Sequence, residues 1–419
     1  MNVLVKNATI LSPESSKHNK TVDVRVVSGK FSELGKLDAA DGEKVFDAEG
    51  AYLSPGFFDL NCAFGDPGFE TKEDMQTVTY AAMAGGFTGL ALLPQTDPVV
   101  QSKSQVAYVL DKAKGNLVAV YPLGAISQQR EGKEIAELFD MQQAGAIAFT
   151  DGDRPLQDDG FMNRALQYAK GCDALLMVSP ENKSIAGKAQ INESKNSVLL
   201  GMKGLPALAE EMHIARDIFL AKYNDCKIHI NCVSTAGAVA LIRQAKKEGV
   251  QISCDVAAHQ LVFTEDLLAD FDSNYKVKPP LRGKADVDAL IVGLKDGTID
   301  AICSQHRPEE IEFKDVEFEI AHYGIIALQT VLPLLLQAKL SPGLIVEKLS
   351  VNSRKLLSLD VPNIEEGEPA NFVIFDVQKQ WTFDSATNRS KSSNSPLMNK
   401  VLTGAVIFVA NNNKQFNAK

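Results

Sequence analysis

Short apolar runs alternate with helix-length amphipathic segments through the middle of the chain, roughly residues 56–360. Each run has the length of a buried strand and ends at polar or turn-forming residues. Strands that alternate with helices form parallel sheets, because parallel strands are usually joined by a helical crossover. Eight runs can be counted, which predicts an α/β fold with a (β/α)8 TIM-type barrel. They occupy residues 57–60, 90–93, 117–120, 146–149, 174–178, 227–232, 251–256 and 299–304.

Both ends of the chain are predicted to form β-structure. Residues 22–27 alternate between apolar and polar side chains near the start, and residues 371–376 and 406–409 are apolar near the end. Two β-rich ends around a long middle predict one small β-sandwich built from both. The predicted domains are 1–55 for the N-terminal part of the sandwich, 56–360 for the barrel and 361–419 for the C-terminal part of the sandwich.

The charge balance narrows the classes of partner. The 419 residues include 43 Lys and Arg against 53 Asp and Glu, which gives a net charge of −10. This balance argues against a nucleic-acid surface or an anionic membrane surface. No signal peptide is recognised, and the apolar runs are far shorter than the ~20 residues that span a bilayer. The six cysteines are scattered, which is typical of reduced thiols. We therefore expect a cytoplasmic protein that binds neither nucleic acid nor membranes.

Residues 59–68, Asp-Leu-Asn-Cys-Ala-Phe-Gly-Asp-Pro-Gly, have the frame of the metal motif D-x-H-x-H-x-R-x-P-G without its histidines or its arginine. Further fragments that carry the resemblance lie at 54–60, 71–74, 84–88, 93–98, 149–151, 233–235, 279–282, 297–302 and 395–397. Together they make the chain resemble class I dihydroorotases, of the amidohydrolase superfamily, along essentially its whole length. The resemblance implies the same barrel and a hydrolase that opens a cyclic amide with two zinc ions.

Most positions to which the resemblance assigns a chemical role carry other residues here. Zinc chemistry needs imidazoles, carboxylates and a proton carrier at the ends of the barrel strands. Only the metal-bridging aspartate is retained, as Asp151. The paired histidines are replaced by Asn61 and Ala63, the substrate-binding arginine by Gly65, a substrate-contacting asparagine by Gln95, two further histidines by Ser179 and Cys232, another asparagine by Lys278, and the catalytic aspartate by Gln305.

These replacements predict a protein that cannot bind the family's zinc ions or catalyse the family's reaction. Asparagine, alanine and serine are poor zinc ligands, and the amide of Gln305 cannot act as a base. We therefore expect no catalytic residues, no bound metal and no other cofactor, and thus a protein that is not an enzyme. The resemblance implies a place in pyrimidine biosynthesis, as a scaffold or activator of aspartate carbamoyltransferase, and we expect a homo-oligomer. The alternatives are an active dihydroorotase or other cyclic-amide hydrolase with a rebuilt site and zinc, or a small-molecule binder that uses the old pocket.

Several residues near the strand ends allow more than one interpretation. Asp151 is either a hydrogen-bonded remnant or part of a cation site. Cys232, Cys303 and Asp151 form either a replacement site for a soft metal or ordinary parts of the core. His259 and His306 are either structural or ligand-binding. The basic side chains of Lys278 and Arg307 either fill the charge of the missing metal, contact Asp151 or lie on the surface; the sequence leaves these alternatives open.

Overall fold

A closed ring of parallel strands forms the centre of the protein. The computed structural model describes residues 1–418. Phe149 occupies one place in the ring through single bridges to Gly124 and Leu176, and a bridge between Cys62 and His306 closes the ring. The fourth predicted strand, 146–149, is thus reduced to a bridge. The other strands are β6 (Phe57–Cys62), β7 (Phe87–Leu92), β8 (Ala119–Pro122), β9 (Leu176–Val178), β12 (Ile228–Ile230), β13 (Ile252–Ala257) and β14 (Ala301–Cys303).

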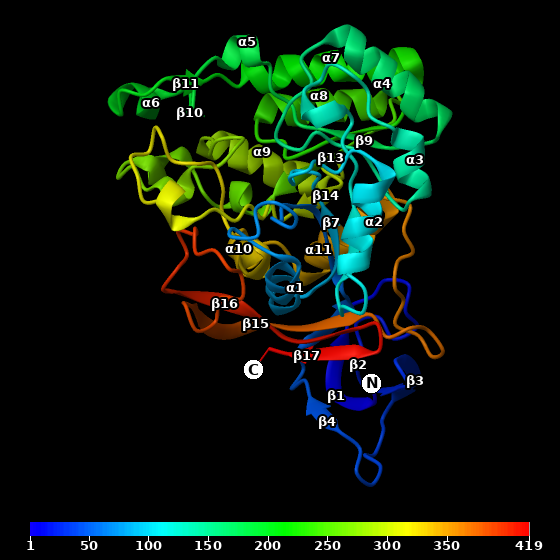
Figure 1. The fold of residues 1–419 in the computed structure, drawn as a ribbon. Coiled ribbons are helices and arrows are strands. Elements are labelled where there is room, and N and C mark those ends of the chain that lie inside the picture. Colours follow the sequence, from blue (N-terminus) through cyan, green and yellow to red (C-terminus); the bar gives the residue numbers. More distant parts are fainter. Residues whose placement is uncertain (419) are drawn as a thin grey trace.

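Helices surround this ring in Figure 1. The first of them begins at a capping box, in which the Asp74 carboxylate accepts a hydrogen bond from the Thr77 amide at 2.9 Å. The longer helices are α1 (Met75–Ala84), α2 (Lys103–Lys112), α3 (Leu138–Gln143), α4 (Asp159–Gly171), α7 (Leu208–Asn224), α8 (Ala236–Lys247), α9 (Lys284–Lys295) and α10 (Val331–Gln337). Shorter elements are α5 (Lys183–Ala186), α6 (Lys195–Leu199), α11 (Pro342–Val346), α12 (Asn352–Leu356) and the strand pair β10 (Ile191–Asn192) and β11 (Gly204–Leu205).

Both ends of the chain meet in a second sheet beside the barrel. Figure 1 shows the blue N-terminal strands and the orange and red C-terminal strands together at the end of the molecule that carries both termini. β15 pairs with β5 in antiparallel register, so the sheet joins the two ends. The predicted fold class is therefore confirmed. The strands are β1 (Val3–Ile10), β2 (Thr21–Val27), β3 (Lys30–Gly35), β4 (Val45–Asp47), β5 (Tyr52–Pro55), β15 (Phe372–Phe383), β16 (Lys400–Asn411) and β17 (Lys414–Asn417).

Asp59 of the sequence frame closes the barrel. Its carboxylate accepts hydrogen bonds from the Ser304 amide at 2.6 Å and from the Ser304 hydroxyl at 2.5 Å. Asp59 lies on β6 and Ser304 directly follows β14, so these bonds join the first strand of the ring to the last. Asp59, the first residue of the motif frame, therefore helps to hold the barrel closed.

In the part of the chain that the structure describes, no helix is both long enough and apolar enough to cross a membrane.

Candidate active site at the barrel mouth

Two neighbouring cavities open at the carboxyl ends of the barrel strands, where barrels of this type place their active sites. The inner cavity has a volume of about 30 Å³, and the outer one about 210 Å³. The side chains of Lys278, Asp153 and Arg307 line both. Most of the site residues predicted from the sequence line one cavity or the other. The inner cavity is also lined by Asn61, Ser179, Cys232 and Gln305, and the outer cavity by Ala63, Gly65 and Gln95.

Several polar side chains around the inner cavity contact other protein groups. The Asn61 amide nitrogen lies 3.5 Å from the sulfur of Cys232. The Ser179 hydroxyl donates to the Gly152 carbonyl at 2.5 Å, and the Gln305 amide donates to the Lys278 carbonyl at 2.9 Å. These side chains are fixed by protein partners, and a space of about 30 Å³ corresponds to roughly one water.

The side chain of Asp151, the retained metal-position aspartate, is hydrogen-bonded to the loop that follows β8. One carboxylate oxygen accepts the amides of Ile126 and Ser127 at 2.9 and 3.0 Å. The other accepts the Ser127 hydroxyl at 2.5 Å. Burial raises the pKa of this carboxyl above its ordinary value. Because both oxygens accept hydrogen bonds from residues 126 and 127, Asp151 holds this loop in place.

The outer cavity is lined by charged groups, and most of them are paired. Lys72 lies 2.8 Å from Glu309, and Lys278 lies 2.8 Å from Glu181. The guanidinium of Arg307 instead donates to the neutral Gln95 side chain at 2.7 Å. Within residues 1–418 no carboxylate lies within ion-pair distance of Arg307. The outer cavity therefore presents one unpaired cation.

Asp153 lines both cavities, although the sequence did not predict it as a site residue. Its carboxylate accepts the Gln95 amide at 2.5 Å and forms an ion pair with Arg130. Burial raises its pKa, the Arg307, Arg130 and Lys278 cations lower it, and the net direction is downward. The cavity thus contains an ionised acceptor beside the unpaired cation. The only sequence signal was its position two residues after the retained Asp151.

Gly65 stands where the family has its substrate-binding arginine, and its surroundings leave no room for a side chain. A Cβ atom at this position would lie 1.9 Å from the Phe69 carbonyl oxygen and 2.5 Å from the Glu73 carbonyl oxygen. The Gly65 amide donates to that Glu73 carbonyl at 3.0 Å. The loop has closed over the place that the arginine would occupy.

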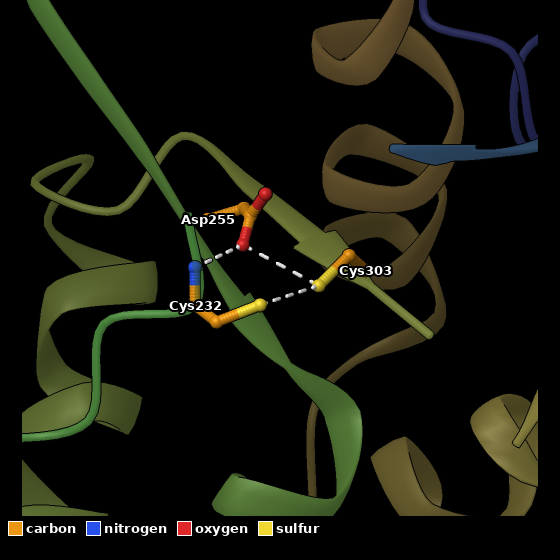
Figure 2. Close-up of side chains that lie close together, drawn as sticks. All are labelled: Cys232, Asp255 and Cys303. Atoms are coloured by element: carbon orange, nitrogen blue, oxygen red, sulfur yellow. Dashed lines mark hydrogen bonds between the residues drawn. The ribbon is translucent and has the colours of Figure 1, made fainter. Parts of the chain in front are cut away.

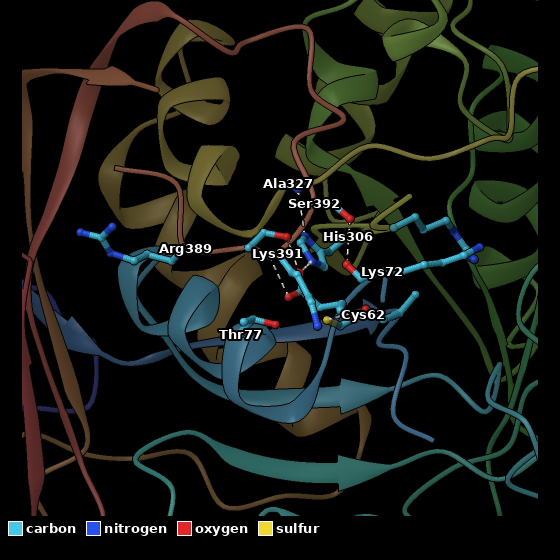
Figure 3. A network of polar contacts seen from close by, with 12 residues as sticks. Cys62, Lys72, Thr77, His306, Ala327, Arg389, Lys391 and Ser392 are labelled. Carbon is cyan, nitrogen blue, oxygen red and sulfur yellow. Dashed lines mark hydrogen bonds and ion pairs between the residues drawn. The ribbon is translucent and has the colours of Figure 1, made fainter. Parts of the chain in front are cut away.

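His306 is held by a buried polar network (Figure 3). Its Nδ1 accepts the Ala327 amide at 3.1 Å, so its Nε2 carries the proton that faces Glu73 at 3.3 Å. The buried Glu73 carboxylate also accepts the Lys391 amide at 3.0 Å and the Ser390 hydroxyl. His306 therefore joins the barrel to the C-terminal segment and has no nitrogen free for a ligand.

His259 is fully buried, and neither of its ring nitrogens has a hydrogen-bond partner among residues 1–418. Burial lowers its pKa to about 4. Because the folded state keeps this imidazole neutral, its contribution to stability is present above the unfolded pKa of ~6.5 and is lost as the pH falls towards 4. His259 lines neither cavity, so the structure gives it no ligand to bind.

We expect His259→Phe to flatten the pH dependence of stability. A pKa that falls by about 2.5 units corresponds to about 3 kcal/mol. Between pH 7 and pH 4 the wild type should therefore lose about 3 kcal/mol more of its unfolding free energy than the variant does. Urea unfolding of both proteins across this range measures the difference. If the unfolding free energies of the two proteins changed in parallel with pH, the pKa of His259 would be the same in the folded and unfolded states.

Cys232 and Cys303 do lie together, but the carboxylate beside them belongs to Asp255 and not to Asp151. The proposed grouping with Asp151 is therefore corrected. The Asp151 carboxylate is held by the β8 loop, whereas Asp255 projects from β13, between the strands that lead to the two cysteines. An acidic residue inside an apolar strand is the signal that could have identified it.

Comparison with known proteins gives one consistent family. A family model described as dihydro-orotase-like matches residues 50–238. The chain is 40% identical over 414 residues to a dihydroorotase from Geotalea daltonii, with 97% of each chain covered. It is 40% identical over 413 residues to one from Acetivibrio thermocellus, with 97% of this chain and 96% of that one covered. An L-hydantoinase (dihydropyrimidinase) from Arthrobacter aurescens shares the fold, with a TM-score of 0.86, 24% identity and coverage of 99% and 95%.

These relatives correct two predictions. The prediction that the chain is not an enzyme is wrong, because proteins 40% identical to it along nearly all of its length are named as an enzyme. The prediction that it needs no metal is also wrong, because its relatives at 40% identity are dihydroorotases, which are metal-dependent. The sequence prediction rested on the family's ligand positions, which do not include Asp255 beside Cys232 and Cys303.

The family's own metal positions nevertheless do not fit a pair of zinc ions in this chain. Asn61, Ala63 and Ser179 provide no imidazole, which leaves Asp151 as the one carboxylate and Cys232 as the one thiol among these positions. A metal in this protein therefore needs a different set of donors.

Proposed function

The chain belongs to the dihydroorotase-like family of amidohydrolases, and we propose that it is a cyclic-amide hydrolase with a rebuilt site, acting on dihydroorotate. The observation that carries the proposal is the unpaired guanidinium of Arg307 in a cavity of about 210 Å³ at the barrel mouth. Dihydroorotate is a small ring with one carboxylate, so it needs a cation in a cavity of this kind. The family's arginine is absent at Gly65, and Arg307, which lines the same cavity, supplies a positive charge there.

The other groups of the outer cavity suit the ring of this substrate. Dihydroorotate carries ring N–H donors as well as its carboxylate. The ionised Asp153 can accept an N–H group, while Arg307 binds the carboxylate through paired, charge-assisted hydrogen bonds. Gln95 bridges the two residues, with contacts of 2.5 Å to Asp153 and 2.7 Å to Arg307, and fixes their spacing. Together these groups bind and orient an anionic cyclic ureide.

Ring opening adds one water across the amide bond: the carbonyl carbon gains OH, and the ring nitrogen gains the proton. In this family a metal ion activates the water when it is bound. Because the family's metal positions do not fit a zinc pair here, we assign no step to such a pair. The residues of this chain bind the carboxylate at Arg307, accept a ring N–H at Asp153 and limit the water in the inner cavity to roughly one molecule.

Purified protein supplied with zinc tests the proposal. Dihydroorotate should open to carbamoyl aspartate, and carbamoyl aspartate should close in the reverse reaction, with a rate proportional to protein through successive purification steps. A hydrolase contaminant is excluded if the rate falls in the Arg307→Gln variant purified in the same way. The absence of turnover in both directions, under conditions in which a related dihydroorotase is active, would overturn the proposal.

Association with aspartate carbamoyltransferase and self-association into a homo-oligomer stay predictions. A bound partner would link two reactions of pyrimidine synthesis in sequence, because one enzyme makes the carbamoyl aspartate that the other closes. Size-exclusion chromatography with light scattering tests both associations. A mass above that of one 45.4 kDa chain would support the oligomer, and co-elution with the transcarbamoylase would support the partner. Separate elution at micromolar concentrations would count against the partner.

A further inference from the structure

We propose that Cys232, Asp255 and Cys303 form a binding site for one thiophilic divalent metal ion, of which zinc is the type, at the floor of the inner cavity. Two of its three donors lie outside the positions at which the family places its ligands. The inference goes beyond the proposed function, because the site can bind an ion whether or not the chain hydrolyses dihydroorotate.

The three donors come from three neighbouring strands and point toward one another (Figure 2). Asp255 lies within β13, Cys303 ends β14, and Cys232 follows β12. The two sulfur atoms are 3.6 Å apart, and the Cys303 sulfur is 3.3 Å from Asp255 Oδ1. All three residues are buried. One carboxylate and two thiols therefore converge in the upper part of the barrel interior.

These spacings match a zinc coordination shell. With Zn–S bonds of about 2.3 Å and a Zn–O bond of about 2.0 Å, tetrahedral geometry separates two sulfurs by about 3.8 Å and a sulfur from an oxygen by about 3.5 Å. The observed 3.6 and 3.3 Å are each shorter by about 0.2 Å. An ion can enter with a small outward movement of the side chains, without a change in the strands.

The surrounding residues hold the donors in position. His229 Nε2 lies 3.0 Å from Asp255 Oδ2, and its Nδ1 lies 2.9 Å from the Ser253 hydroxyl, so the imidazole fixes the carboxylate and directs Oδ1 at the sulfurs. Cys232 has a φ of 52°, a left-handed conformation that is unusual for a residue with a side chain. In this conformation its amide donates to Asp255 Oδ1 at 2.7 Å while its sulfur faces Cys303.

Asn61 supplies a fourth position. It is 2% exposed, and its Oδ1 has no hydrogen-bond partner in the described part of the chain, whereas its Nδ2 lies 3.5 Å from the Cys232 sulfur. A half-turn of the amide exchanges the two atoms, which directs the oxygen toward the cluster. Asn61 and Cys232 both line the inner cavity, so an ion or a water ligand can reach the site from the barrel mouth.

The balance of charge allows the ion to be buried. Without metal, two neutral thiols and one carboxylate carry a charge of about −1. Binding releases the two thiol protons, and two thiolates, one carboxylate and one divalent cation again carry about −1. The exchange therefore adds no net charge to the interior, where an unpaired charge would be costly. It also needs no oxidant, unlike a disulfide between the same two sulfurs.

Metal binding by the purified, reduced protein without substrate tests the site. We expect about one zinc per chain after exposure to zinc and dialysis, and X-ray absorption of that zinc should show two sulfur ligands at about 2.3 Å. Titration with cobalt should give the sulfur-to-cobalt charge-transfer absorption of a thiolate site. These readouts use the wild-type chain and no activity, so their failure is separate from failure of the proposed hydrolysis.

Variants locate the ion. Cys303→Ser and Asp255→Asn should each weaken binding by about 100-fold, as judged by competition with a chelating dye. Cys254→Ser is the matched control, because Cys254 is buried on β13 beside Asp255 but lies outside the cluster, and it should bind as the wild type does. Zinc far below one per chain, zinc without sulfur ligands, equal loss in the control, or a Cys232–Cys303 disulfide with no uptake after reduction would each overturn the proposal.

Discussion

Replacing Arg307 by glutamine should raise the KM for dihydroorotate by about 100-fold, with a smaller change in kcat. The guanidinium is the unpaired cation of the outer cavity, so the variant loses a charge-assisted contact with the substrate carboxylate. Such contacts contribute about 1.5–3 kcal/mol, and 100-fold corresponds to about 2.7 kcal/mol. Glutamine keeps a polar side chain beside Gln95, so the cavity should retain its shape. Steady-state kinetics in both directions measure the effect.

Two further variants separate this role from a general effect of charge. Arg243→Gln removes the same charge from the molecular surface, where Arg243 pairs with Asp296, and should leave KM unchanged. Lys72→Met removes a cation that Glu309 already neutralises, so its effect should be well below that of Arg307→Gln. An unchanged KM in Arg307→Gln, or equal changes in all three variants, would place the substrate carboxylate elsewhere.

The barrel could be predicted because its signal is spread over the whole middle of the chain. Seven of the eight apolar runs fall on strands, and β6 and β14 are joined by Asp59, a residue of the recognised frame. The run at 146–149 forms only the bridge at Phe149, since pairing there depends on neighbours that are distant in sequence. The pairing of β15 with β5 is a contact of the same kind.

The candidate site was harder to predict, because its chemistry depends on where side chains point. The sequence identified Asp151 as the retained group, but only the structure shows that both of its oxygens hold the β8 loop. Asp153 and Asp255 lie outside the motif fragments that carry the resemblance, so a comparison of motifs passes over them. Substituted positions alone predict lost function, but the outer cavity contains the unpaired cation of Arg307, and a thiol pair lies beside a buried carboxylate in the barrel interior.

Gly65→Ala should lower the free energy of unfolding by about 3 kcal/mol, and Gly65→Arg should lower it by at least as much. Any Cβ at this position overlaps the Phe69 carbonyl at 1.9 Å, so the loop must open, and overpacking of this kind typically costs about 1–3 kcal/mol. Restoring the family's arginine should therefore damage the outer cavity and leave substrate binding unimproved. Urea unfolding and the KM of each variant measure both effects.

Gly171→Ala is the matched control, because a Cβ at Gly171 meets no atom within 4 Å and the residue ends α4. Alanine there should be neutral or slightly stabilising, since it restricts the unfolded chain.

If Gly65→Ala were as stable as this control, the loop would be free to move aside, and an arginine at position 65 could again reach the substrate. If Gly65→Arg also lowered KM, the present charge arrangement around Arg307 would be one of two equivalent solutions. Loss of stability with no gain in binding would instead show that the closed loop has no room for an arginine at position 65, which leaves Arg307 as the cation available to the substrate carboxylate.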